Sequence, residues 1–194
     1  MRVRFVSGMV KVIGLGIFAG LGVACGTAPL EPLLLNYSFE EGLAGWDSRA
    51  SLLPAGLAWS INPVPQPTFE GAGSTRFSLD AAGGEGAIWV QKHIPLTMGK
   101  DGLVSARISL YARVEGTPPQ EPQLLLWAWG SAPFDRNSFT AKKPVALTEA
   151  WNEYSWTGRV QTSGKALWFA FGIEVPQGAA ATVYIDKVAV EVTK

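Results

Sequence analysis

The stretch Ala181–Val192, Ala-Thr-Val-Tyr-Ile-Asp-Lys-Val-Ala-Val-Glu-Val, decides the fold. Its β-branched and apolar residues flank one acidic residue, Asp186, and this composition is typical of a buried β-strand. A carboxylate inside such a strand costs free energy unless it is paired or bound to a cation. The acidic pair Glu40 and Glu41, at the other end of the chain, is the best candidate to meet Asp186. Carboxylates brought together need a cation, and calcium suits oxygen ligands.

The composition favours many strands joined by turns. Among 194 residues, 47% are hydrophobic and 16% are charged, where about 25% charged is usual. The 22 glycines and 13 prolines are spread between the apolar runs, as in an all-β protein. The formal net charge is zero, so nothing suggests a nucleic acid as partner.

Apolar and polar residues alternate in run after run, which is the period of a half-buried strand. Glycine- and proline-containing turns separate the runs, and no stretch has a convincing helical period. We therefore expect one all-β domain: a two-sheet antiparallel β-sandwich, or jelly roll. The predicted strands are Leu33–Phe39, Arg49–Leu53, Leu57–Ile61, Ser74–Asp80, Ala87–Ile94, Leu103–Val114, Leu124–Gly130, Asn152–Val160, Ala166–Val175 and Thr182–Val192.

The N-terminal 24 residues have the features of a signal peptide. A basic start precedes the apolar run Val12–Ala24, and the segment Leu21–Gly26 resembles a bacterial lipobox, whose cysteine becomes acylated. Here Gly22 stands where the lipobox usually has leucine. We expect a signal peptide at 1–24, an acylated Cys25 with a linker at 25–32, and a domain at 33–194. The alternative is an ordinary signal cut near Ala24 or Ala28.

The predicted anchor places the protein in the cell envelope, lipid-anchored or secreted, where we expect a monomer. With one cysteine and one histidine, His93, the chain offers neither an internal disulfide nor a Cys/His zinc cluster. A Ser-His-Asp triad would have only His93 as its base.

Three segments resemble carbohydrate-binding modules of families 4, 9 and 22. Asn36–Trp46 is similar to their opening, an Asn-x-x-Phe-Glu stretch followed by Gly and Gly-Trp. Trp151–Tyr154 resembles a Trp-x-x-Tyr strand entry in their second half, and Val183–Val188 resembles their closing Ile-Asp-Asp-Val strand. The chain departs from the last pattern at Lys187, which replaces the second acid. The three segments span nearly the whole predicted domain.

This resemblance implies a jelly roll of the galactose-binding type with a structural calcium where the first and last strands meet. The implied ligands are the side chain of Glu40, the side chain and main-chain oxygen of Asp186, and carbonyl oxygens of residues 70–74. The alternative is that the two carboxylates cap turns or pair with Lys187 or Arg76. Calcium would join two ends of the chain, so its removal would lower stability.

Strand alternation predicts a face that recognises sugars. Sugar rings have apolar faces that stack on aromatic rings and hydroxyl groups that need polar partners. If neighbouring strands form one concave sheet, the outward residues of four strands line a groove. The expected ring platforms are Trp89, Trp127, Trp129 and Trp168, and the expected polar contacts are Gln91, Arg107, Tyr111, Arg113 and Glu174.

Alternatives remain for each group. Trp127 and Trp129 could belong to the core, loops could cover Trp89 and Trp168, and the arginines could be a solvated face. The remaining four tryptophans are interpreted as packing residues: Trp46, Trp59, Trp151 and Trp156.

A glycosidase needs two carboxylates across a cleft, and only Glu174 is expected on the outer face. We therefore expect no enzyme. The favoured function is a non-catalytic domain that binds polysaccharide or oligosaccharide by aromatic stacking, displayed on the bacterial cell envelope and touching the membrane through its lipid anchor only. The alternative is a structural or protein-interaction jelly roll without a sugar ligand.

Overall fold

The computed structural model describes residues 32–96, 102–118, 120–130, 147–162 and 166–193. All ten predicted strands are present, with ends that shift by a few residues. The predicted signal peptide, Cys25 and most of the linker lie outside the described residues. The strands are β1 Leu33–Tyr37, β2 Asp47–Leu53, β3 Trp59–Val64, β4 Ser74–Asp80, β5 Glu85–Pro95, β6 Gly102–Val114, β7 Gln123–Trp129, β8 Asn152–Thr162, β9 Ala166–Val175 and β10 Ala180–Thr193.

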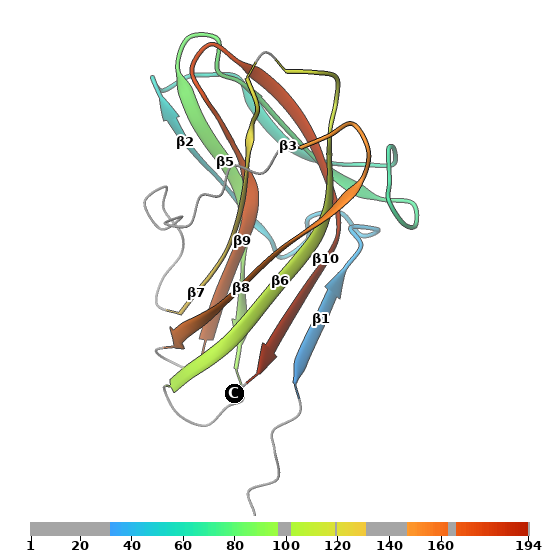
Figure 1. The fold of residues 1–194 in the computed structure, drawn as a ribbon, viewed down its shortest axis with the longest axis vertical. Coiled ribbons are helices and arrows are strands. Elements are labelled where there is room, and N and C mark those ends of the chain that lie inside the picture. The colour runs from blue at the N-terminus through green and yellow to red at the C-terminus, as the bar shows by residue number, and fades with distance from the viewer. Residues whose placement is uncertain (1–31, 97–101, 119, 131–146, 163–165, 194) are drawn as a thin grey trace, which may run out of the picture.

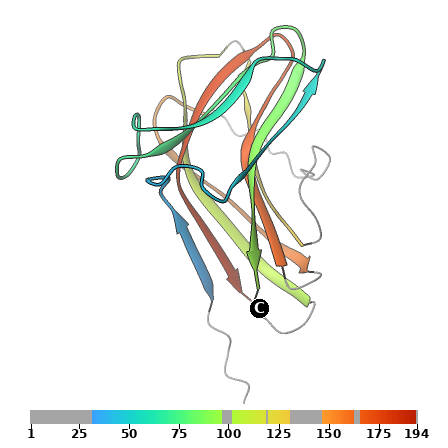
Figure 2. The ribbon, with the colours of Figure 1, turned by 180° about the vertical axis from the view of Figure 1, so that it is seen from behind.

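The strands form two antiparallel sheets packed face to face (Figures 1 and 2). Sheet A has the order β3-β4-β10-β6-β8, and β1 pairs with the same edge of β10 as β4 does, further along the strand. Sheet B has the order β2-β5-β9-β7. The predicted two-sheet β-sandwich is therefore confirmed, and β7 and β8 are edge strands of different sheets.

The core lies between the sheets, where alternate residues of each strand are buried. In β9, Phe169, Phe171 and Ile173 are fully buried. Trp46 packs on the edge of this layer, with its ring 5.2 Å from that of Phe169 and 5.1 Å from that of Phe171. The prediction that Trp46 is a packing residue is confirmed by these contacts.

The central strand β10 contains a β-bulge at Asp186. Val183 and Ile185 are fully buried, and so are Val188 and Val190 beyond the bulge. A regular strand would place odd and even positions on opposite faces. The register with β6 shifts between Asp186 and Ala189, so one extra residue returns the apolar side chains to the core.

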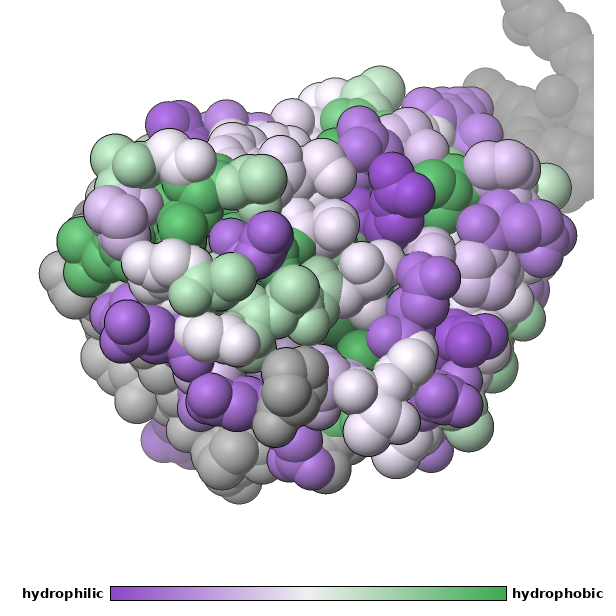
Figure 3. Space-filling view, turned by 90° about the horizontal axis from the view of Figure 1, so that it is seen from above, coloured by the Kyte–Doolittle hydropathy of each residue, from purple (hydrophilic) through white to green (hydrophobic). Residues whose placement is uncertain are grey.

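Both ends of the described domain lie at the same end of the molecule. β1 pairs antiparallel with the last residues of β10, and Leu33 is the register partner of Val192 (Figure 1). The opposite end, at the top of Figure 1, shows small hydrophobic groups separated by hydrophilic residues (Figure 3). The described residues in that view therefore form no continuous apolar surface.

Candidate functional site

The register of sheet B brings the four predicted ring platforms onto its outer face. Directly paired residues of neighbouring antiparallel strands point to the same side. Trp127 of β7 pairs with Ala170 of β9, while Trp129 pairs with Trp168. Trp168 in turn pairs with His93 of β5, and the rings of these two residues lie 5.1 Å apart. A row of three rings therefore crosses one end of the sheet.

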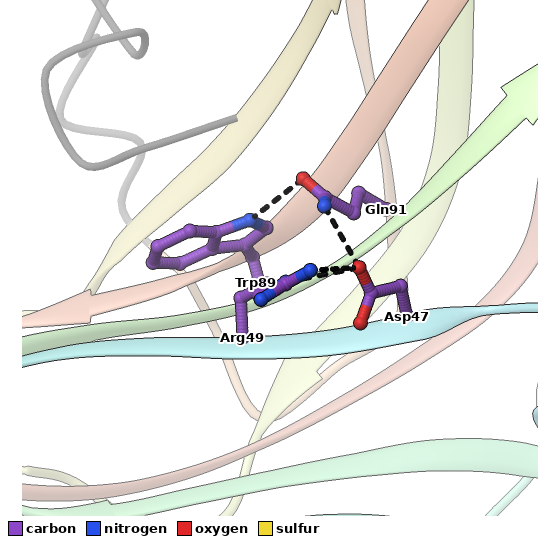
Figure 4. Close-up of polar contacts among 4 residues, drawn as sticks. All are labelled: Asp47, Arg49, Trp89 and Gln91. Atoms are coloured by element: carbon purple, nitrogen blue, oxygen red, sulfur yellow. Dashed lines mark hydrogen bonds and ion pairs between the residues drawn. The ribbon is translucent and has the colours of Figure 1, made fainter. Parts of the chain in front are cut away.

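The part of this face nearer β2 is closed. The Trp89 side chain is 3% exposed and Gln91 is 0% exposed, so the expectation of solvent-accessible sugar contacts at these two residues is wrong. The polar groups of both residues take part in a network with β2 (Figure 4). The indole Nε1 of Trp89 donates to Gln91 Oε1 at 3.4 Å, and Gln91 Nε2 donates to Asp47 Oδ2 at 3.0 Å.

Arg49 completes the network by donating to the same oxygen of Asp47 at 2.6 Å. Because Arg49 is the register partner of Trp89, its side chain lies beside the indole (Figure 4). The hydrogen-bonding groups of Gln91 thus have partners in the protein. The predicted contact Glu174 is also buried, at 9% exposed, between Ala87 on β5 and Gln123 on β7. The expectation that Glu174 faces solvent is therefore wrong.

A groove opens where the edge strands β7 and β8 of the two sheets approach each other. It has a volume of about 510 Å³ and is called the edge groove here. Its described lining consists of Trp127, Ala128, Trp129, Gly130, Trp156, Thr157, Gly158, Arg159, Val160 and Gln161. Three tryptophans thus line one cavity together with the polar residues Thr157, Arg159 and Gln161.

The indoles of the edge groove differ in exposure. Trp129 is 40% exposed, whereas Trp127 and Trp156 are half-buried, with ring centroids 4.9 Å apart and planes inclined by 46°. The indole Nε1 of Trp127 is buried and has no hydrogen-bond partner. A buried donor of this kind calls for an acceptor, and a ligand hydroxyl group is one that would serve.

Trp156, Arg159 and Gln161 are groove residues that the sequence interpretation missed. Trp156 pairs with Ile108 and faces the interior, as a packing residue does, but its edge strand also leaves it beside the groove. The polar residues Arg159 and Gln161 alternate along β8, and only knowledge that β8 is an edge strand would have drawn attention to them.

Trp59 was expected to be a packing residue and is instead 40% exposed. It lies on β3, the edge of sheet A away from β8, so one of its sides has no neighbouring strand. The fourth residue in that group, Trp151, is half-buried and meets Phe69 edge-on at 6.1 Å.

Arg107, Tyr111 and Arg113 do not join the tryptophans. All three are on β6, which lies in sheet A, so they occupy the opposite outer face of the sandwich. The prediction of one shared groove is wrong for them, because strand alternation gives the face of a residue but not the sheet. Arg107 lies 3.9 Å from Glu153 in an exposed ion pair.

Tyr111 is occupied by packing contacts. Its ring stacks on that of Phe69 with a centroid separation of 3.6 Å and an angle of 11°. The ammonium group of Lys187 lies 5.6 Å from the Phe69 ring and 5.9 Å from the Tyr111 ring, distances at which a cation is attracted to an aromatic face.

The two predicted metal ligands approach the same loop. Asp186 is 0% exposed and accepts hydrogen bonds from the backbone N–H groups of Phe69, at 2.9 Å, and Glu70, at 3.1 Å. Glu40 accepts from the backbone N–H of Ala72 at 2.9 and 3.0 Å. Burial raises the pKa of Asp186, the three backbone hydrogen bonds lower it, and the charge of Glu40 raises it further.

This donor set fits calcium only in part. Two carboxylates share one loop, as expected, but the loop presents amide N–H groups to them where carbonyl oxygens were expected. Calcium takes six to eight oxygen ligands. Among the described residues, no group of three or more acidic, cysteine or histidine side chains is placed to hold a metal. Calcium therefore remains a prediction, and carbonyl and water oxygens would have to supply the rest of its ligands.

No protein-family model and no curated protein matches the sequence. Solved structures do match its fold. A family 61 carbohydrate-binding module, TmCBM61, in complex with β-1,4-galactotriose, has a TM-score of 0.51 and 15% identity, covering 79% of this chain and 92% of that chain. The CBM22-1 xylan-binding domain of Paenibacillus barcinonensis Xyn10C has a TM-score of 0.51 and 17% identity, covering 82% and 94%.

A third similar structure is the family 11 carbohydrate-binding module of Clostridium thermocellum in complex with a β-1,3-1,4-mixed-linked tetrasaccharide. Its TM-score is 0.50 at 10% identity, with 81% of this chain and 94% of that chain covered. The chain therefore has the β-sandwich jelly-roll fold of carbohydrate-binding modules, as the resemblance of its three segments implied. Within the ranges that the structure describes, no helix is long and apolar enough to cross a membrane.

Proposed function

We propose that this chain is a non-catalytic carbohydrate-binding domain that holds a polysaccharide or oligosaccharide in the edge groove. The observation that carries the proposal is the groove lining, which combines three indoles with Arg159 and Gln161 in a cavity of about 510 Å³. Aromatic faces stack on the apolar faces of sugar rings, and a few polar groups fix their orientation. The partly exposed Trp129 is the main platform.

The row of rings on sheet B extends this site. Trp129 pairs with Trp168, and Trp168 lies against His93, so a sugar chain leaving the groove would meet further rings along the sheet end. This retains part of the predicted aromatic face. Trp89, Gln91 and Glu174 support the sheet and do not contact the sugar in this proposal, because they are buried.

Sugar binding without hydrolysis is favoured by the composition of the groove. A glycosidase requires a pair of carboxyl groups roughly 5 to 9.5 Å apart across the scissile bond. The described residues that line the edge groove include neither aspartate nor glutamate. The similar solved structures are themselves carbohydrate-binding modules or a xylan-binding domain, which agrees with a binding role.

The test is a comparison of two tryptophan substitutions. Trp129 and Trp59 are both 40% exposed, but Trp59 lies on β3, at the far edge of sheet A. Binding of soluble β-1,4-galactan, xylan and mixed-linkage β-glucan is measured by calorimetry and tryptophan fluorescence. We expect Trp129→Ala to weaken binding of the recognised glycan by roughly tenfold or more, and Trp59→Ala to leave it nearly unchanged.

Equal losses in the two variants would exclude the edge groove as the site. Failure of the unchanged protein to bind any glycan on a broad array would remove the carbohydrate proposal and favour the structural or protein-interaction alternative. Release of reducing sugars by the unchanged protein would contradict the non-catalytic role.

We also propose that Cys25 anchors the domain to the bacterial cell envelope. This rests on the sequence alone: a basic start, an apolar run and a single cysteine after a small residue. Expression of the chain with a labelled fatty acid tests it, since label should enter the unchanged protein and not Cys25→Ala. Equal labelling of both, or of neither, would overturn the anchor.

A further inference from the structure

A polar row crosses the outer face of sheet A. Arg76 of β4 and Arg113 of β6 are both register partners of Tyr184 on β10. Asn62 of β3 is in turn the partner of Arg76. Directly paired residues share a face, so the two arginines flank Tyr184 on neighbouring strands about 4.8 Å away on either side. The central position of β10 makes this a rigid frame.

Arg76 and Arg113 have no acceptor among the residues that the structure describes. The Nε atoms of Arg76 and Arg113 are buried and lack a hydrogen-bond partner, and neither side chain forms an ion pair with any residue that the structure describes. Two other arginines on the outer faces are paired: Arg49 with Asp47 and Arg107 with Glu153. Buried donors without acceptors are uncommon in folded proteins and indicate a missing partner.

The carboxylate of Glu115, which lies beside Tyr184, is already engaged. The Tyr184 hydroxyl group donates to Glu115 Oε2 at 2.8 Å. Burial, followed by the hydrogen bond and charge of Glu115, raises the pKa of Tyr184, whereas the charges of Arg76 and Arg113 lower it. Both guanidinium groups therefore lie near this hydroxyl. Two positive charges and one negative charge leave the row with an excess of one positive charge.

We propose that Arg76 and Arg113, held on either side of Tyr184, form a binding site for an oxyanion group of a ligand. The guanidinium fork matches the two oxygens of a carboxylate or phosphate group and binds them through charge-assisted hydrogen bonds. The carboxylate of a uronic-acid sugar and a phosphate group share this chemistry. The site is separate from the edge groove, so it does not depend on the proposed sugar-binding site there.

The experiment measures binding of tetragalacturonate and of inorganic phosphate to the full chain by calorimetry. Arg76→Gln and Arg113→Gln each remove one fork. Arg107→Gln is the matched control, because it removes the same charge from the outer face of β6. We expect each row variant to weaken the preferred anion by about tenfold and the control by less than about twofold. Preference for tetragalacturonate identifies a carboxylate, and preference for phosphate identifies a phosphate group.

Arg113→Lys is a second variant that keeps the positive charge and the sheet packing. It should still bind several-fold more weakly than the unchanged protein, because a lysine lacks the planar fork. Binding of neither anion, or equal losses in Arg107→Gln and the row variants, would overturn the site. Trp129→Ala should bind both anions as the unchanged protein does. A failure of the anion site can therefore be distinguished from a failure of the edge groove.

Discussion

Asp186 ties the stability of the fold to pH. Its carboxyl group is fully buried, and burial raises its pKa above the ordinary value of 3.8 despite three backbone hydrogen bonds. A carboxyl group with a raised folded-state pKa favours folding most in its protonated form. Its contribution is therefore fully present at low pH and is lost as the pH rises through the folded-state pKa.

Substitution of Asp186 by Asn tests this direction. In metal-free buffer, the free energy of unfolding of the unchanged protein relative to Asp186→Asn should fall as the pH rises from about 3.5 to 7. Denaturant titrations of both proteins at each pH measure the difference. The matched variant Glu41→Gln removes an exposed carboxyl group next to Glu40 and should show no such trend. A difference that rises with pH would contradict the raised pKa.

Single-residue roles were predictable where a strand pattern alone decides them. Alternation placed Trp127, Trp129 and Trp168 on an outer face, and the structure brings them to sheet B. It could not reveal that Gln91 is hydrogen-bonded to Asp47, because the register between β2 and β5 determines that contact. Burial of a polar side chain by a cross-strand partner leaves no periodic signal in the sequence.

At the scale of elements, Gly172 on β9 lies where an added side chain would collide with the backbone of the neighbouring strand β5. A Cβ atom there would lie 2.5 Å from Trp89 Cα and 2.6 Å from Trp89 Cβ, and would overlap the carbonyl oxygen of Ile88. Real Cβ atoms do not approach backbone this closely, so the strand would have to shift. β5 and β9 pair along ten residues, which leaves little freedom for that movement.

Gly172→Ala should therefore lower the free energy of unfolding by about 1 to 3 kcal/mol, the usual effect of overpacking. Gly83→Ala is the control, since its Cβ would meet only a Leu57 methyl group at 3.9 Å, and its effect should stay within about 0.5 kcal/mol. Urea denaturation of the two variants compares them. Equal stability would show that β5 and β9 separate easily.

Strand boundaries were predicted well, whereas strand neighbours were not. Turn residues and alternation reproduced Ser74–Asp80 and Ala166–Val175 without change. Even the β-bulge has a trace in the sequence, because the buried positions change from odd to even between Ile185 and Val188. The assignment of β6 to sheet A has no such trace. It depends on long-range pairing, and this is why Arg107, Tyr111 and Arg113 were grouped with the wrong strands.

For the whole molecule, the proposed calcium would connect the opening segment to the last strand through Glu40 and Asp186. A ligand that binds only the folded state stabilises it by about 2.7 kcal/mol at one hundred times its Kd. Calcium should then raise the Tm by several degrees relative to EDTA, since about 2 to 4 °C per kcal/mol is usual for domains of this size. Scanning calorimetry in both buffers measures the shift.

Glu40→Gln should abolish the shift, whereas the neighbouring Glu41→Gln should keep it. Glu40 holds the backbone of Ala72, while Glu41 is exposed beside it. If the unchanged protein has the same Tm with calcium and with EDTA, the predicted structural calcium is excluded. The amide hydrogen bonds would then be the only link between these two carboxylates and the loop.

The pairing of Leu33 with Val192 permits the chain to be reconnected in a different order. Register partners in antiparallel strands have Cα atoms roughly 5 Å apart, so a short flexible peptide would bridge the old ends. New ends could be opened at Gly116, an exposed glycine with nothing within 4 Å of its Cβ position. Such a circular permutant should fold, because surface turns tolerate this kind of cut. It would carry its termini away from the end where β1 begins, which allows the domain to be mounted on a support in the reverse orientation.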